Sequence, residues 1–160
     1  MRLGRRAALL ALLPPLPALA QPVDHKQGVL GHLSAQIGTN NTPQILADPA
    51  VRRTLASLLG EPGVRLLASN LQLVAPIAFD GTALVLRGAR QQALGEQEAF
   101  LSIRPRDGIM EVAILTGGRV RFVSQRPSGE RSEMLDPQLL RWGVGRGVPL
   151  DERRVPPATR

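Results

Sequence analysis

A segment bracketed by two glycines contains the side chains best suited to bind a partner. Its residues are Gly88, Ala89, Arg90, Gln91, Gln92, Ala93, Leu94 and Gly95. An arginine guanidinium pairs bidentately with a carboxylate, and a glutamine amide donates a hydrogen bond to the same group. The segment is longer than a hairpin turn requires, and such loops on rigid strands commonly carry binding function. We therefore expect Arg90, with Gln91 or Gln92, to contact an acidic partner.

The rest of the sequence offers no comparable arrangement for catalysis or metal binding. It has no cysteine, so it can form neither a thiol nucleophile nor a disulfide. No recognised metal-ligand spacing surrounds the two histidines, His25 and His32. The acids near the loop are expected at turns and exposed strand positions rather than as a close pair: Asp80, Glu96, Glu98, Asp107 and Glu111. We predict no enzymatic activity, no metal and no cofactor.

The segments that flank the loop read as short strands joined by tight turns. Asp80-Gly81, Asp107-Gly108 and Gly117-Gly118 each separate two apolar runs, where a tight turn needs positive φ at low steric cost. The expected strands are 71–79, 83–87, 98–104, 109–115 and 119–124. Pro76 cannot donate to a ladder, so the first strand is an edge or is bulged there. Because the connections are short, neighbouring strands should be antiparallel.

Helices are expected before and after the strands. Asp48 as N-cap and Pro49 at the first helical position begin an amphipathic helix that ends at Gly60. A shorter helical stretch, 64–69, follows, and Asp136-Pro137 repeats the capping signal before a helix over 138–142. The predicted fold class is α+β, a five-stranded antiparallel sheet packed by an N-terminal amphipathic helix and short flanking helices. The positions expected to be most buried are Leu101, Ile103, Val112 and Ile114.

The chain divides into four regions by composition. Residues 1–20 combine a basic start, an apolar stretch and a small-residue pattern, which predicts a secretory signal peptide cleaved after Ala20. The apolar stretch is too short and too rich in proline to span a bilayer, so we expect a periplasmic protein without a membrane span. Residues 21–44 are predicted to be a flexible arm or a loosely docked segment, 45–142 the folded domain, and 143–160 a disordered tail rich in Gly, Pro and Arg.

The charge of the protein comes mainly from arginine. Removal of Arg2, Arg5 and Arg6 with the signal peptide lowers the formal net charge from +7 to +4. Aromatic residues make up 2% of the chain, which leaves few platforms on which nucleic-acid bases could stack. We therefore expect no nucleic-acid partner, and we assign Arg119 and Arg121 to a solvated sheet face. The composition leaves a homodimer open.

The order of the predicted elements resembles the exported bacterial inhibitors of vertebrate lysozyme, the Ivy family, over roughly residues 45–124. After a capped helix and a short second helix, the segments that carry the likeness are Leu84-Val85-Leu86-Arg87-Gly88, the bracketed loop, and Glu96-Gln97-Glu98-Ala99-Phe100-Leu101-Ser102-Ile103. The family is known for a central antiparallel sheet flanked by helices. Its protruding loop has the pattern Cys-Lys-Pro-His-Asp-Cys, and a disulfide closes it. In that family the loop enters the lysozyme cleft, where its histidine engages the catalytic acids. The resemblance implies a corresponding place for the loop of this chain.

The corresponding loop of this chain keeps little of that pattern. Position by position, the family's six residues correspond to Ala89, Arg90, Gln91, Gln92, Ala93 and Leu94. Only the basic character at Arg90 is kept, and both the disulfide and the histidine are missing. Without the disulfide, a partner must meet the cost of ordering the loop. The positive net charge also opposes approach to a basic lysozyme.

Two functions follow from these observations. The first is an exported inhibitor of lysozyme or of another peptidoglycan-cleaving glycosidase, acting through the loop 88–95, because Arg90 suits a cleft lined by acids. The alternative is a non-inhibitory periplasmic interaction domain or envelope-associated domain on the same fold. In that alternative, the loop is only a polar connection between two strands.

Overall fold

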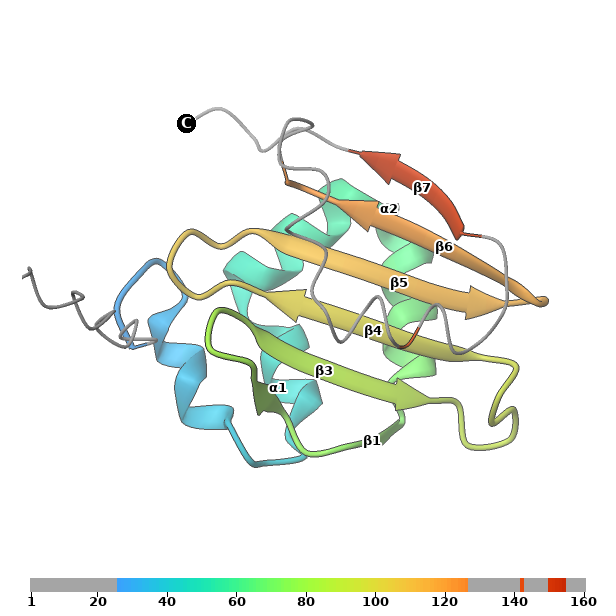
Figure 1. Cartoon of the computed structure of the whole chain (residues 1–160), viewed down its shortest axis with the longest axis horizontal. Helices are drawn as coiled ribbons and strands as arrows, with labels where there is room; N and C mark the ends of the chain where they lie inside the picture. Colours follow the sequence, from blue (N-terminus) through green and yellow to red (C-terminus); the bar gives the residue numbers. More distant parts are fainter. Residues whose placement is uncertain (1–25, 127–141, 143–149, 155–160) are drawn as a thin grey trace, which may run out of the picture.

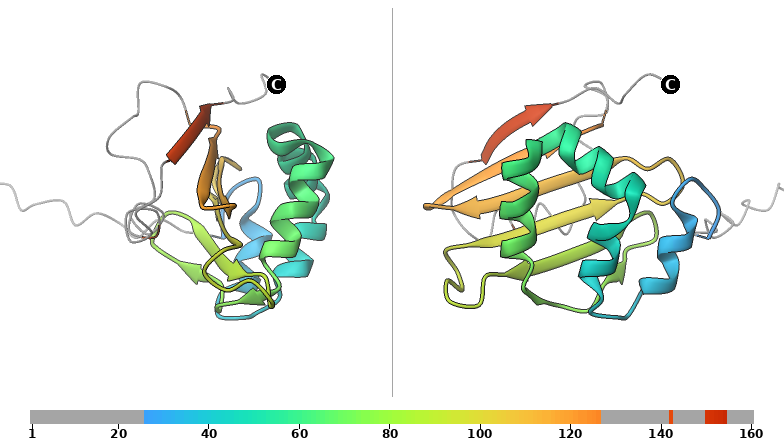
Figure 2. Two further views of the ribbon diagram at one scale, coloured as in Figure 1. Left: turned by 90° about the vertical axis from the view of Figure 1, so that its right-hand side faces the viewer. Right: turned by 180° about the vertical axis from the view of Figure 1, so that it is seen from behind.

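The computed structural model describes residues 26–126, Trp142 and the backbone of 150–154. These residues form a layer of helices packed on one face of an open sheet (Figures 1 and 2). The helices are η1 (Gly31–Gln36), α1 (Thr42–Ala47) and α2 (Pro49–Asn70). The strands are β1 (Leu73–Val74), β2 (Ala78–Phe79), β3 (Leu84–Ala89), β4 (Glu98–Ile103), β5 (Met110–Thr116), β6 (Arg119–Ser124) and β7 (Leu150–Arg154). The predicted α+β class is confirmed.

The predicted strands form one sheet in the order β1-β3-β4-β5-β6, with antiparallel neighbours. The first predicted strand is divided into β1 and β2, which both pair with β3. Val74 faces Gly88 and Ala78 faces Val85, so residues 75–77 oppose the shorter segment 86–87. The bulge predicted at Pro76 is therefore confirmed, because a residue without an N–H cannot continue the ladder.

A further strand lies outside the predicted set. β7 pairs in parallel with β6 and extends the sheet at that edge (Figure 1). The sequence predicted disorder over 143–160, and the strand at 150–154 departs from that prediction. Its short, charged sequence, LDERR, lacks the apolar alternation by which the other strands were recognised. The rest of that tail, residues 1–25 and the predicted helix up to 141 lie outside the described residues.

The long helix α2 joins the two predicted helices across a kink. The Asp48 side chain caps its start by accepting hydrogen bonds from the backbone N–H groups of Ala50 and Val51, at 2.9 and 3.1 Å. Gly60 has φ 70° and ψ 165°, a conformation that only glycine adopts readily. Both halves of α2 lie on the same face of the sheet (Figure 2).

The described part of the segment before α1 is docked on the domain and does not form a flexible arm, the first of the two states predicted from the sequence. Leu30 and Leu33 are buried in the main core. The backbone N–H of Leu30 donates to Pro105 at 2.9 Å, and that of Ile77 donates to Thr39 at 2.8 Å. The prediction followed a composition rich in Gly and Gln, but two leucines three residues apart are enough to anchor a 3₁₀ turn.

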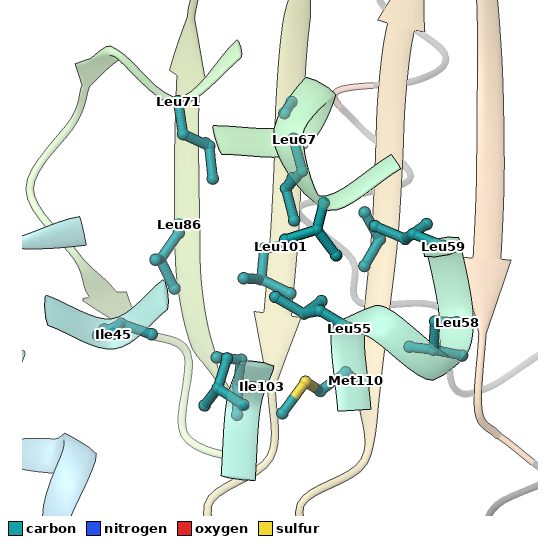
Figure 3. Packing of buried hydrophobic residues seen from close by; sticks show 14 of the residues in the cluster. Ile45, Leu55, Leu58, Leu59, Leu67, Leu71, Leu86, Leu101, Ile103 and Met110 are labelled. Carbon is teal, nitrogen blue, oxygen red and sulfur yellow. The ribbon is translucent and has the colours of Figure 1, made fainter. Parts of the chain in front are cut away.

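The main core lies between α2 and the sheet. Leu55 and Leu67 of α2 belong to the same cluster as Leu86 and Leu101 of the sheet (Figure 3). The four predicted core residues are all buried, namely Leu101, Ile103, Val112 and Ile114. A second cluster occupies the other face of the sheet and includes Val85, Phe100, Ala113, Leu115, Val120 and Phe122. Arg119 and Arg121 are exposed, as predicted.

The cap of α2 also makes the protein's stability depend on pH. Burial acts to raise the pKa of Asp48. The hydrogen bond with His32, at 2.8 Å, and the bonds from Val51 and Ala50 lower this pKa by more than burial raises it. The net pKa of Asp48 is below its ordinary value. The ionised group therefore stabilises the fold above the unfolded-state pKa, near 3.9, and this stabilisation is lost as the pH falls through the lower folded-state pKa.

We expect Asp48→Asn, which keeps a capping oxygen, to be less stable than the original protein at pH 7. The difference should shrink as the pH falls from about 5 toward 2, because Asp48 is then protonated in both states. Thermal melts across this range measure it. Glu61→Gln, an exposed carboxylate on the same helix, is the control. A difference for Asp48→Asn that stays constant with pH would contradict the assignment.

Candidate binding loop

The candidate loop lies at one end of the sheet, between β3 and β4 (Figure 1). Its first two predicted residues belong to β3, since Gly88 pairs with Val74 and Ala99, and Ala89 pairs with Glu98. A Cβ at Gly88 would lie 2.8 Å from the carbonyl oxygen of Leu73, so glycine allows β1 to approach β3. The connection itself therefore runs over 90–97, two residues later than the glycine bracket suggested.

Backbone hydrogen bonds close this connection. The N–H of Arg90 donates to Gln97 at 2.9 Å, and the N–H of Ala93 donates back to Arg90 at 3.0 Å. The N–H groups of Glu96 and Gln97 both donate to the carbonyl of Ala93, at 3.1 and 2.9 Å. Two successive tight turns thus hold the loop without a disulfide, which reduces the entropy that a partner must remove.

The predicted binding side chains lie on the outer part of the loop. Arg90, Gln91 and Gln92 are exposed. Nη1 of Arg90 donates to Oε1 of Gln97 at 3.0 Å, so the guanidinium is held by the far side of its own loop. Leu94 is 67% exposed, the most exposed large apolar side chain among the described residues. The loop thus presents one cation, two amides, one apolar side chain and the exposed carboxylate of Glu96 on a short closed turn.

The base of the loop is held by a residue that the sequence placed at an exposed position. Glu98 is only 8% exposed. Its Oε1 accepts from the backbone N–H of Gly95 at 3.1 Å, and its Oε2 accepts from Nε1 of Trp142 at 3.2 Å. The Trp142 ring also lies 6.3 Å from that of Phe100, as expected for a tryptophan docked on the sheet. The one feature of the sequence that is consistent with Glu98 holding the base of the loop is its position at the start of a strand.

A second acid, Glu111, was also wrongly assigned to an exposed position. It is 2% exposed on β5, and its Oε1 lies 2.8 Å from Nε of Arg126. The alternation of β5 turns Glu111 toward the same face as Ala113 and Phe122, which is the face of the second apolar cluster. A charged side chain is rarely buried in such a cluster unless it is paired. The pairing arginine follows β6 and is not part of any recognisable motif.

Groups for metal binding do not assemble in the described part of the chain. Among residues 26–126 and Trp142, no cluster of three or more His, Asp or Glu side chains could hold a metal ion. His32 pairs with Asp48 near the start of α2, and η1, which carries it, lies at the opposite end of the sheet from the loop (Figure 1). His25 lies outside the described residues. No helix in the described ranges is both long and apolar enough to cross a membrane.

The fold and the loop together define a small α+β protein that projects a closed turn from one end of an antiparallel sheet. A comparison with protein families matches residues 50–141 to the inhibitor of vertebrate lysozyme (Ivy) family, and the chain belongs to this family. The matched region contains α2 from its second residue onward, β1 to β6 and the whole candidate loop. Searches among curated proteins and solved structures gave no match. The resemblance found in the sequence is therefore confirmed at the level of the family.

Proposed function

We propose that this protein inhibits a lysozyme or another peptidoglycan-cleaving glycosidase by inserting into its cleft the connection 90–97, which carries the exposed residues of the predicted loop 88–95. The observation that carries the proposal is Arg90, exposed on a hydrogen-bonded turn in a chain of a lysozyme-inhibitor family. A loop that already has one conformation loses less entropy on binding than a flexible one does. Preorganisation by hydrogen bonds thus supports inhibition despite the missing disulfide.

The chemistry of the target supports the same proposal. Most glycosidases use a pair of carboxylates on either side of the scissile bond. A guanidinium at Arg90 would pair with one of them, and the amides of Gln91 or Gln92 would donate to the other. Leu94 would bury its exposed side chain against the wall of the cleft, which adds an apolar contact beside the charged one. Each of these contacts is made by an exposed residue of the loop.

The first 20 residues and the net charge bear on where the protein acts and on which enzymes it inhibits. We propose that the chain is exported, cleaved after Ala20 and active in the periplasm, because residues 1–20 have the pattern of a signal peptide. The mature charge of +4 opposes capture of a strongly basic lysozyme. The glutamine in place of the family's histidine removes a further contact. We therefore expect weak inhibition of vertebrate lysozyme and stronger inhibition of a less basic enzyme.

The test is a lysis assay in which the mature protein is titrated against vertebrate lysozyme and a panel of bacterial peptidoglycan-cleaving glycosidases. Arg90→Ala should weaken inhibition about tenfold or more, because it removes a charge-assisted hydrogen bond to the target. Arg53→Ala is the matched control, since it removes the same charge from an exposed position on α2. Inhibition by the control should be unchanged.

Two results would overturn parts of this proposal. Nanomolar inhibition of vertebrate lysozyme, about −12 kcal/mol of binding free energy, would contradict the expected weakness. A loss of inhibition in Gln92→Ala but not in Arg90→Ala would show that another loop residue makes the decisive contact.

The alternative, a non-inhibitory periplasmic interaction domain or envelope-associated domain, is favoured by the missing histidine and disulfide. It would be supported if the original protein inhibited no enzyme of the panel. A pull-down from envelope extract with the mature protein would then identify what it binds.

A further inference from the structure

Glu98 makes hydrogen bonds to three parts of the chain, two through its carboxylate and one through its backbone carbonyl. One oxygen accepts from Gly95 in the loop, and the other accepts from the indole of Trp142. The backbone carbonyl of Glu98 also accepts from Nδ2 of Asn70, at 3.3 Å, and the same amide donates to the carbonyl of Leu115. Glu98 thus connects the loop to α2, to β5 and to Trp142.

We propose that Glu98 is a positioning residue that holds the loop in its binding conformation. Gly95 has φ 83°, a backbone conformation that glycine adopts more readily than other residues. The Glu98 carboxylate lies at 3.1 Å to accept that N–H, and the loop's second turn ends against it. This inference rests on the proposed function, because it assigns the residue that keeps Arg90 and Leu94 presented to a partner.

The chemistry of the site requires a carboxylate rather than any polar side chain. A carboxylate accepts through both oxygens, whereas a glutamine has only one acceptor and two additional donors. Two N–H donors approach Glu98 on different oxygens, so Glu98→Gln must lose one of the two bonds. At 8% exposure, water has little access to replace the lost partner. Because the single acceptor oxygen of the glutamine can face either donor, the loop and the indole are each held for only part of the time.

Trp142 provides a spectroscopic signal at this site. It is the only tryptophan of the chain. Its ring and Glu98 line an open hollow of about 290 Å³ beside β1, so the indole is half-buried and responds to changes around it. Because the indole N–H donates to the carboxylate, the emission of Trp142 reports directly on whether that bond is made.

The first experiment compares Glu98→Gln with Glu96→Gln as free proteins. Glu96 is an exposed acid of the same loop, so its variant removes the same charge without removing an acceptor of Gly95. In Glu98→Gln we expect a shifted Trp142 emission and about tenfold faster hydrogen exchange at the Gly95 amide. Exchange at the Leu101 amide in β4 should stay unchanged, which separates loop release from loss of global stability. Glu96→Gln should change neither quantity.

A second variant tests the other donor. Trp142→Phe keeps an aromatic ring against Phe100 but removes the N–H that holds one oxygen of the Glu98 carboxylate. The carboxylate is then held less firmly toward Gly95 but still accepts from it. The Gly95 amide should therefore exchange faster than in the original protein and more slowly than in Glu98→Gln. Unchanged Gly95 exchange in both variants, with unchanged emission in Glu98→Gln, would overturn the positioning role. Faster exchange at Gly95 and Leu101 alike would also overturn it, because Glu98 would then serve only global stability.

Binding measurements connect this role to the proposed function. With a glycosidase that the original protein inhibits, Glu98→Gln should weaken inhibition about tenfold, while Glu61→Gln, which removes an exposed carboxylate from α2, should not, and equal effects would contradict the inference. If the original protein inhibits no glycosidase, the proposed function fails, and the exchange and emission measurements on the free protein still decide the role of Glu98. The two failures are therefore distinguishable.

Discussion

Leu101→Ala is expected to lower the free energy of unfolding by about 2–5 kcal/mol. Leu101 is fully buried at the centre of β4, where it pairs with Leu86 of β3 and Val112 of β5. It faces α2 within the main core (Figure 3). The truncation removes apolar contacts and leaves a cavity that a sheet with neighbours on both sides cannot close. Chemical denaturation of both proteins measures the difference.

The matched control is Leu94→Ala, the same substitution at a side chain that is 67% exposed. Its effect on unfolding should stay within about 0.5 kcal/mol, because the side chain is already in water. The pair also separates stability from binding, since Leu94 belongs to the proposed contact surface and Leu101 does not. If Leu101→Ala unfolds at nearly the same denaturant concentration as the original protein, then β4 does not pack against α2 as described.

Glu111→Ala should cost about 3 kcal/mol of stability, because removing one partner of a buried ion pair leaves an uncompensated charge. Nε of Arg126 lies 2.8 Å from Oε1 of Glu111 but without the alignment of a hydrogen bond, so the attraction is mainly coulombic. Oγ of Ser124 donates to the same oxygen at 3.1 Å. The two side chains of the ion pair are 2% and 12% exposed, so water screens this charge only slightly.

An exposed pair of the same type provides the control. Glu61 lies 2.9 Å from Arg52 on α2, and both side chains are more than half exposed. Glu61→Ala should therefore change the stability by less than about 1 kcal/mol. The comparison isolates burial, because the residue types and the separation of the charges are nearly the same. Equal losses in the two variants, measured by denaturation at pH 7, would contradict the buried assignment of Glu111.

The strands and the long helix were predictable because their signals are local. Asp-Gly and Gly-Gly turns mark the strand ends, and the structure has positive φ at Gly81, Gly108, Gly117 and Gly118. Asp48 and Pro49 likewise begin α2 where the sequence predicts it. Each of these features depends on residues within a few positions of one another, so composition and spacing are sufficient to find it.

The elements that the sequence missed depend on contacts between distant segments. The segment around Leu30 and Leu33 looked too polar to fold, but a core built by later residues gives it a place to pack. β7 has no apolar alternation of its own, and it is a strand only because the edge of β6 supplies hydrogen-bond partners. Neither element would be expected to form alone.

The sequence by itself determined the α+β class, the family, and the position of the loop between two strands, since these follow from turn residues, periodicity and element order. Only the tertiary structure decided which acids are buried and what closes the loop. Glu98 and Trp142 are 44 positions apart, and Glu98 and Asn70 are 28 apart. Contacts of this kind arise when the sheet brings strand ends together, and side chains so far apart in the chain leave no local pattern to recognise.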